Sequence, residues 1–384
     1  MVDGKQCTVV WYVDDNKISH VDPKVVDKVI DDIEKQFGKM TVTRGKKHTF
    51  VGMDITFTPN NRVNIIMKDY ITECFTVFAE DLTKGAATPA TRHLFEINEN
   101  SLKLNEEKSE IFHHIVSKLL YVAQRARIDI QLTIAFLCTR VSCSTEEDWG
   151  KLNRLLRYLY STIDMPRILG ANGFEMIQTW VDAAYAVHAD MRSHTGGLMS
   201  LGTGVFNSKS IKQKLNTKSS TEAEVVGASD YLPFTIWTKR FLKAQGYNLD
   251  TNIYYQDNES AIKMETNGRK SCGEKSRHID IRYFFIKDVI KREGIDIKHC
   301  PTDLMLADYF TKPQQGKLFK TMRDIIMGIA KYPIEECVGK GDPECTIDGL
   351  TIKEDKTSNK VKPKMTYAQV LRGTTENVLK IENR

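Results

Sequence analysis

Four acidic residues in different structural settings are the positions at which this sequence predicts chemistry. Asp182 and Asp257 each end an apolar or aromatic strand pattern, whereas Glu224 and Asp308 lie in helical patterns. Attack of water on a phosphodiester is helped by two divalent cations about 3.5–4 Å apart, which need hard oxygen ligands from several elements. These four residues are therefore candidate catalytic and metal-ligating residues for two Mg²⁺ or Mn²⁺ ions.

Each of these carboxylates also has an ordinary structural interpretation. An Asp at a strand end commonly begins a turn, which would explain Asp182. Asp257 is followed by Asn258, which can cap the next helix. Asp308 can be a surface residue of a short helix. The order of the four positions along the chain favours the metal-ligand interpretation.

Two glutamates compete for the helical position. Glu222 stands three residues after Ser219, as in a capping box, and Glu224 stands three residues after Thr221 in the same pattern. Residues two apart on a helix point about 200° away from each other, so only one of the two glutamates can face the ions. The spacing leaves both assignments open.

Several segments together resemble the C-terminal part of a copia-type LTR-retrotransposon Pol polyprotein, the end of a reverse transcriptase followed by ribonuclease H. The segments extend over about residues 5–320 and are Tyr12-Val13-Asp14-Asp15, Lys218–Glu224, Asp257–Ala261, His278–Tyr283 and Ala307–Pro313. The resemblance implies a magnesium-dependent endonuclease that cuts the RNA strand of RNA/DNA hybrids. It also implies nucleic acid and the remainder of Pol as partners, and a cytoplasmic (virus-like particle) or nuclear location.

The same resemblance implies roles for the four carboxylates. Asp182 and Asp257 would share the two ions, Glu224 would hold one of them, and Asp308 would complete the second site. The aliphatic pair that follows Glu224 matches the family's pattern, so the resemblance assigns the ligand role to Glu224 and leaves the capping role to Glu222.

Further residues are candidates for proton handling and nucleic-acid contact. His299 precedes Asp308 by nine positions, near where many ribonucleases H keep a proton-handling histidine, although copia-type elements do not reliably keep it. Basic side chains beside the Glu224 helix and in the His278–Tyr283 segment are candidates for contact with the phosphate backbone of a nucleic acid, or they form a solvated protein surface. These residues are Lys209, Lys212, Lys214, Lys218 and Arg282. Arg125 and Arg127 allow the same two interpretations.

Asp14 and Asp15 are expected near the turn of a hairpin, because a β-branched and aromatic run stops at this pair and then resumes. The pair resembles the polymerase motif of a reverse-transcriptase palm, and it can also be a solvated turn. A palm needs a further Asp on an earlier strand. We therefore expect a vestigial polymerase motif and no DNA synthesis by this chain alone.

The pattern of elements predicts a fold of the α+β or α/β class. Together with the resemblance it implies four parts: a truncated reverse-transcriptase palm (1–95), a helical thumb and connection (96–170), a ribonuclease H-like domain (174–330) and a mostly disordered basic tail (331–384). The ribonuclease H-like part is expected to be a mixed five-stranded sheet flanked by helices. Local patterns predict a helix at Pro23–Phe37, strands at Thr49–Thr58 and Val63–Met67, a linker at 163–173 and a β-meander with glycines at its corners.

The composition is that of an ordinary globular protein and limits the function only weakly. The chain has 384 residues, of which 41% are hydrophobic and 27% charged, and a net charge of +5 that permits nucleic-acid binding. No segment is apolar enough to cross a membrane, and the eight cysteines are expected to be reduced. Two further functions remain open: a catalytically silent nucleic-acid-binding relic, and a subunit that completes a separately encoded polymerase.

Overall fold

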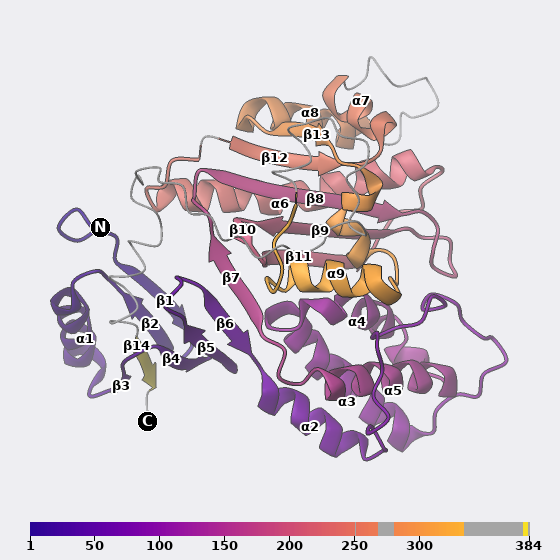
Figure 1. Cartoon of the computed structure of the whole chain (residues 1–384), viewed down its shortest axis with the longest axis horizontal. Helices are drawn as coiled ribbons and strands as arrows, with labels where there is room; N and C mark the ends of the chain where they lie inside the picture. Colours follow the sequence, from indigo (N-terminus) through magenta and orange to yellow (C-terminus); the bar gives the residue numbers. More distant parts are fainter. Residues whose placement is uncertain (250, 268–279, 334–378, 383–384) are drawn as a thin grey trace.

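The computed structural model describes residues 1–249, 251–267, 280–333 and 379–382, with the side chains of 280–284 and 379–382 outside the description. Most of the predicted tail and His278 lie outside the described residues, as does the side chain of Arg282. The described chain forms three sheets and a group of helices (Figure 1), a mixed α+β fold.

The N-terminal part consists of two antiparallel sheets and one helix. Its elements are β1 (Thr8–Tyr12), β2 (Asp15–Ser19), α1 (Pro23–Phe37), β3 (Thr41–Thr43), β4 (Lys47–Phe50), β5 (Met53–Phe57) and β6 (Val63–Ile66). One sheet has the order β1-β2-β14-β3, where β14 (Leu379–Glu382) is a strand within the predicted tail. The other has the order β10-β7-β6-β5-β4, where β7 is Arg167–Ala171 and β10 is Gly202–Thr203.

Local predictions in this part are confirmed for the helix and the hairpin but only in part for one strand. Helix α1 has the predicted bounds, and Val13 and Asp14 form the turn between β1 and β2. The predicted strand Thr49–Thr58 is confirmed only in part, because it contains β5 and the end of β4, whereas Val51 and Gly52 have φ values of 52° and 71° and reverse the chain between them. A β-branched residue rarely adopts positive φ, so residue preferences did not indicate this turn.

The central part is helical, as predicted. It contains α2 (Lys68–Phe78), α3 (Glu106–Arg125), α4 (Gln131–Cys138) and α5 (Glu146–Ser161), with short 3₁₀ turns η1 (Ile128–Ile130) and η2 (Val141–Cys143). The predicted linker at 163–173 is wrong, because strand β7 lies in the middle of it and pairs antiparallel with β6. The chain therefore passes from the helices into the C-terminal part through a strand of the N-terminal sheet.

The C-terminal part is a mixed five-stranded sheet with helices, which confirms this element of the prediction. Its further elements are β8 (Met176–Ala184), β9 (His194–Ser200), β11 (Val205–Lys212), α6 (Ser220–Ala244), β12 (Thr251–Gln256), α7 (Glu259–Asn267), α8 (Asp280–Glu293), β13 (Asp296–His299), η5 (Thr302–Leu304), η6 (Leu306–Phe310) and α9 (Gly316–Ile326). The strand order is β11-β9-β8-β12-β13. Strands β8, β9 and β11 pair antiparallel, whereas β12 is parallel to both β8 and β13.

Both faces of this sheet are covered, each by a different hydrophobic core. On one face Ile177 and Val181 pack with residues of α6 and α8. On the other, Trp180 and Leu198 belong to the same core as α3, α4, α5 and α9. In Figure 1, α9 lies between the sheet and the group of helices α2–α5. One continuous core thus extends across the predicted boundary at 170–174.

This core also extends past the predicted start of the tail. Tyr332 packs edge-on against Trp180, with ring centroids 5.1 Å apart, and its hydroxyl donates to the backbone oxygen of Leu304 at 2.7 Å. The described residues up to 333 therefore include packed side chains that the predicted boundary at 331 assigned to the tail.

A buried ion pair lies where the helices meet the C-terminal part. The Arg127 guanidinium donates two hydrogen bonds to Asp129, at 2.9 and 2.7 Å, and both side chains are almost completely buried. The Tyr158 hydroxyl donates to Asp129 at 2.6 Å, and Tyr309 of η6 donates to the backbone oxygen of Asp129 at 3.1 Å. Arg127 is therefore neither a phosphate contact nor part of a solvated face, in contrast to both sequence interpretations.

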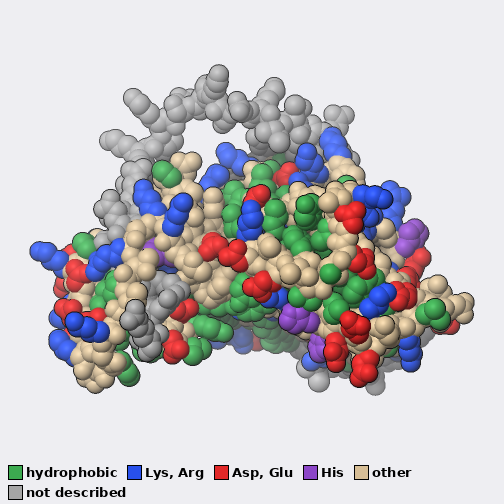
Figure 2. Space-filling model, turned by 90° about the horizontal axis from the view of Figure 1, so that it is seen from below, with side chains coloured by type: hydrophobic (Ala, Val, Ile, Leu, Met, Phe, Trp, Pro, Cys, Tyr) green, Lys and Arg blue, Asp and Glu red, His purple; other side chains and the backbone are tan. Residues whose placement is uncertain are grey.

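The surface charges are mixed where they can be seen. Lys and Arg side chains alternate with Asp and Glu over the face in Figure 2, with apolar side chains exposed between them. In the described segments, no helix combines the length and apolar character that a membrane crossing requires. The five cysteines in these segments, Cys7, Cys74, Cys138, Cys143 and Cys300, are free, as predicted for reduced thiols.

We predict that Asp129→Asn lowers the free energy of unfolding by about 3–5 kcal/mol, because it leaves a buried guanidinium without its counter-charge. The matched control is Asp164→Asn, which breaks an exposed ion pair with Lys68 and should cost no more than about 1 kcal/mol. Urea unfolding of the full chain measures both. If both variants lower the free energy of unfolding by the same small amount, the buried Arg127–Asp129 pair does not stabilise the contact between the helices and η6.

Candidate metal centre

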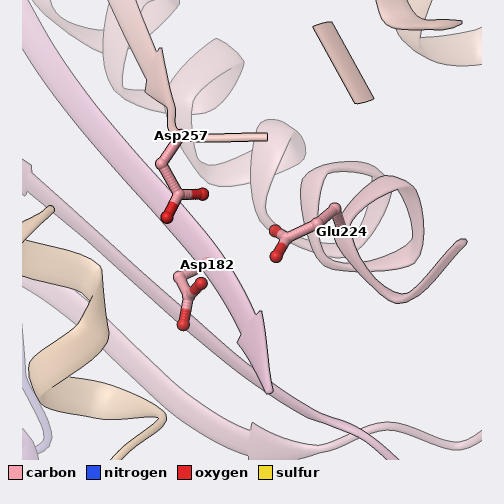
Figure 3. A group of neighbouring side chains, drawn as sticks. All are labelled: Asp182, Glu224 and Asp257. Carbon is pink, nitrogen blue, oxygen red and sulfur yellow. The ribbon is translucent and has the colours of Figure 1, made fainter. Parts of the chain in front are cut away.

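Three carboxylates converge at one edge of the C-terminal sheet. Asp182 comes from β8, Glu224 from the first turns of α6, and Asp257 directly follows β12. One oxygen from each lies within 4.8 Å of the others, and Figure 3 shows the three side chains pointing into a common space. Three of the four predicted ligands are therefore brought together.

Sheet pairing explains why the two aspartates meet. Strands β8 and β12 are parallel, with Trp180 paired to Tyr255. Continuing this register by two residues places Asp257 beside Asp182, because the carboxyl ends of neighbouring parallel strands meet at the same edge. Asp182 and Asp257 are 75 residues apart in the sequence, and this separation does not indicate that their side chains are close. The pairing of β8 with β12 brings them together.

Two glycines in the middle of β9 allow helical elements to approach the sheet closely from both faces. Gly196 pairs with Asp182, and a Cβ at Gly196 would lie 2.7 Å from the backbone oxygen of Ala307 in η6. A Cβ at Gly197 would lie 2.3 Å from the Tyr231 ring of α6. These glycines are not at the corners of the meander as predicted, whereas Gly202 and Gly204, both with positive φ, lie at its turn.

Two uncharged side chains hold the carboxylates in place. Gln256 is fully buried; its amide nitrogen donates to Glu224 at 3.3 Å, and its oxygen accepts from the backbone nitrogen of Asp257 at 2.9 Å. The Thr311 hydroxyl donates to Asp182. Sequence analysis missed both roles, although a polar residue at the buried end of the apolar strand β12 was a signal for Gln256.

Burial and mutual repulsion disfavour the charged forms of these carboxyl groups. Burial raises the pKa of Glu224 well above its ordinary value of 4.5, and the negative charges of Asp182 and Asp257 raise it further. Burial and Asp182 also raise the pKa of Asp257, while Lys312 and His299 oppose this effect. The chain thus concentrates acidic groups that repel one another at neutral pH unless a cation compensates them.

Asp308 lies near this group but is not one of the three converging side chains. It lies in η6, and its carboxylate accepts a hydrogen bond of 2.7 Å from Lys312. Burial and the charge of Asp182 raise the pKa of Asp308 to about 7, although Lys312 opposes them. Burial would lower the pKa of Lys312, but Asp182 and Asp308 hold it above its ordinary value, so its ammonium group stays charged.

Glu222 and Glu224 are two residues apart on α6, so their side chains point in different directions and make different contacts. Ser219 caps the helix by accepting from the backbone nitrogen of Glu222 at 3.2 Å, and the Glu222 carboxylate accepts from the backbone nitrogen of Lys218 at 2.7 Å. Glu222 therefore acts at the helix start and Glu224 points to the other carboxylates. The resemblance-based choice between them agrees with this geometry.

The other candidate contacts lie around the carboxylate group without joining it. His299 is exposed at the end of β13 and lies close enough to lower the pKa of Asp257. Lys212 pairs with Asp190 at 2.7 Å, and Lys209 lies 5.1 Å from the centre of the Phe234 ring. Lys214 and Lys218 are exposed beside the start of α6.

The polymerase-like pair is placed differently. Asp14 is exposed in the turn of the β1–β2 hairpin, and Asp15 begins β2. Within the residues that the structure describes, Asp182, Glu224 and Asp257 are the one group of three or more His, Cys, Asp or Glu side chains whose ligand atoms converge. Asp14 and Asp15 are therefore not part of such a group among the described residues, and their assignment as a vestigial polymerase motif stays a prediction.

The converging side chains fit a hard divalent cation. They supply only carboxylate oxygens, which Mg²⁺ and Mn²⁺ prefer over nitrogen or sulfur donors. They come from two strand ends and a helix that are fixed by buried packing, so the chain holds them together although their charges repel. A cation at this point would remove the repulsion that raises the pKa of Glu224 and Asp257.

Comparison with known proteins finds relatives over most of the chain, although no family model matches it. The Pol polyprotein of tobacco transposon TNT 1-94 is 26% identical over 83% of this chain and 24% of its own length. A Ty1-NL2 Gag-Pol polyprotein of Saccharomyces cerevisiae is 22% identical over 83% of this chain and 19% of its own. A putative Ty5-1 transposon protein of the same yeast is 27% identical over 58% of this chain and 71% of its own.

Among solved structures, the RNase H1 of the halophilic archaeon Halobacterium salinarum NRC-1 aligns with 36% of this chain and 91% of its own, at 14% identity and a TM-score of 0.24. The sequence relatives are Pol polyproteins of plant and yeast transposons. They confirm the prediction of a copia-type relationship, and this chain covers about a quarter or less of the plant and Ty1 polyproteins.

We predict that Glu224→Gln stabilises the metal-free chain and that the gain grows as pH rises above about 4.5. The folded chain binds the Glu224 proton more tightly than the unfolded chain, so deprotonation costs stability above the ordinary pKa, and Gln removes that cost. A pKa difference of one is worth about 1.4 kcal/mol. Thermal unfolding in a chelator from pH 4 to pH 8 measures the gain.

Glu222→Gln is the matched control, because Gln can still accept the hydrogen bond from Lys218. Its stability should follow that of the native chain at every pH. A pH-dependent gain in Glu222→Gln, together with none in Glu224→Gln, would show that the helix face toward Asp182 and Asp257 has been assigned wrongly.

Proposed function

Since this chain is a relative of copia-type retrotransposon Pol polyproteins, we propose that it is a ribonuclease H that cuts the RNA strand of RNA/DNA hybrids. The observation that carries the proposal is the convergence of Asp182, Glu224 and Asp257 from a strand, a helix and a second strand end. Their order along the chain and their meeting at one sheet edge are what the resemblance requires.

In this proposal Asp182, Glu224 and Asp257 hold a divalent cation, Mg²⁺ or Mn²⁺. When bound, such an ion lowers the pKa of a water molecule and stabilises negative charge on phosphate oxygens. Gln256 keeps Glu224 turned toward the two aspartates, and Thr311 fixes one oxygen of Asp182. The protein thereby orients its carboxylates before substrate arrives, which lowers the reorganisation needed for catalysis.

A proton-handling role remains for His299 in this proposal. Its ring is exposed and lies close enough to Asp257 to affect the pKa of that carboxyl group, so it is near the carboxylates without being buried among them. An imidazole can accept a proton at one ring nitrogen and donate one from the other. His299 can therefore carry a proton between the reacting phosphate and water.

The substrate assignment rests on lysines that precede α6, the helix of Glu224. Lys214 and Lys218 are exposed in the segment that leads into α6, and Lys209 lies on β11, the strand before that segment. Lysines at such positions suit the phosphate backbone of a duplex. A hybrid is recognised by its shape and its 2′-hydroxyls rather than by base sequence, so we propose cleavage with little sequence preference.

We predict that the full chain cuts an end-labelled RNA/DNA hybrid in Mg²⁺ or Mn²⁺ and leaves single-stranded RNA intact. Asp182→Asn should lower the rate by orders of magnitude, because it removes a ligand charge. Asp296→Asn, at an exposed position at the start of β13, should cut at the native rate. The full chain is used because the core of the helices covers one face of the sheet.

Failure to cut across several hybrid lengths and both metals, by a chain that unfolds cooperatively, would refute the proposed activity. Binding of the hybrid without cleavage would then identify the chain as a nucleic-acid-binding relic. Equal losses in Asp182→Asn and Asp296→Asn would show that the loss comes from folding and not from the carboxylate group.

We further predict that the purified full chain does not extend a primer on an RNA template. Asp14 and Asp15 have no third carboxylate near them in the described structure, and two ligands are a poor cage for two ions. Template-directed incorporation of labelled nucleotide measures the activity. Extension that disappears in the Asp15→Asn variant would contradict this prediction and assign a polymerase site to the hairpin.

A further inference from the structure

Lys312 lies between two carboxylates at the edge of the proposed metal centre. Its ammonium nitrogen is 2.7 Å from an oxygen of Asp308 and 3.8 Å from an oxygen of Asp182. The neighbouring Thr311 donates from its hydroxyl to that same Asp182 oxygen. The ammonium group of Lys312 therefore lies between Asp182, which belongs to the converging carboxylates, and Asp308, the fourth predicted ligand.

The local backbone directs Lys312 to this position. The backbone nitrogen of Lys312 donates to the backbone oxygen of Asp308 at 2.9 Å. The chain therefore makes one turn between the two residues, and their side chains lie on the same side of that turn. Gly196 lets η6 approach β9 opposite Asp182, which brings this turn against the sheet. The contact thus follows from the packing of η6.

An ammonium group and a divalent ion cannot share this position. The two ions of a phosphodiester-cleaving site lie about 3.5–4 Å apart. If Asp308 completes the second ion site, as the resemblance implies, that ion would lie between Asp182 and Asp308, where the ammonium of Lys312 forms ion pairs with both carboxylates. Like charges at such a separation repel strongly when partly buried.

We propose that the positively charged ammonium group of Lys312 occupies the position at which a second divalent ion would bind in this centre. The native chain then takes up one divalent ion, at Asp182, Glu224 and Asp257, and a second ion binds only when the Lys312 side chain is removed or displaced. This inference rests on the proposed function for the identity of the metal centre, and it corrects the two-ion expectation for the resting chain.

The Lys312 side chain is 45% exposed, so it can leave Asp308 without breaking the core. Asp308 by contrast is 7% exposed. Removing the ammonium leaves this buried carboxylate without its nearest positive charge, a state that a divalent cation relieves. A lysine that served only to stabilise the turn would change the melting temperature and leave the number of bound ions unchanged.

The test is a Mn²⁺ titration of the full chain by calorimetry, with bound ion counted independently by electron paramagnetic resonance. The native chain should bind about one ion, and Lys312→Met about two, as in a two-ion centre. Lys312→Arg keeps the positive charge and should bind one. Lys320→Met removes the same charge from an exposed position on α9 and should also bind one.

Adding Asp308→Asn to Lys312→Met should return the count to one, because it removes the ligand of the second ion. Melting temperatures confirm that each variant is folded. Two ions of similar affinity in the native chain would overturn the proposal, as would a count of one in a folded Lys312→Met chain. Uptake by the native chain that Asp182→Asn abolishes, without hybrid cleavage, would refute the proposed activity and leave the role of Lys312 intact.

Discussion

Repulsion among buried carboxylates is the constraint on which this structure depends. Asp182, Glu224 and Asp257 bring their oxygens within 4.8 Å of one another at a sheet edge where Asp182 and Glu224 are buried and Asp257 is partly buried. Such an arrangement disfavours the charged state and is stable only if packing elsewhere fixes the backbone that carries it. Burial raises the pKa values of Glu224 and Asp257, and the charges of the neighbouring carboxylates raise them further.

The required rigidity comes from both faces of the C-terminal sheet. On one face α6 packs against β8 and β9, and Gly197 leaves room for the Tyr231 ring. On the other face the core of α3–α5 and α9 continues to Trp180 and Leu198. The buried pair Arg127–Asp129 and the hydroxyl of Tyr309 connect those helices to η6. The helical region therefore helps to hold the sheet edge that carries the three carboxylates.

The polar contacts around the carboxylates divide into two kinds. Gln256 and Thr311 are uncharged, and their hydrogen bonds orient the carboxylates of Glu224 and Asp182. Lys312 carries a full positive charge and offsets part of the repulsion between Asp182 and Asp308. The chain itself therefore already neutralises part of the negative charge at this acidic edge.

The sequence by itself determined which carboxylate residues are present, their order and the local helix geometry. The helical period separates Glu222 from Glu224, and the bounds of α1 follow from its apolar spacing. Tertiary structure alone decided that Asp308 lies outside the converging group, that Arg127 is buried, and that Gly196 is a point of close approach and not a corner. The physical reason is that periodicity reports which face of one element is buried, whereas distances between elements depend on strand pairing and on the packing of cores across the chain.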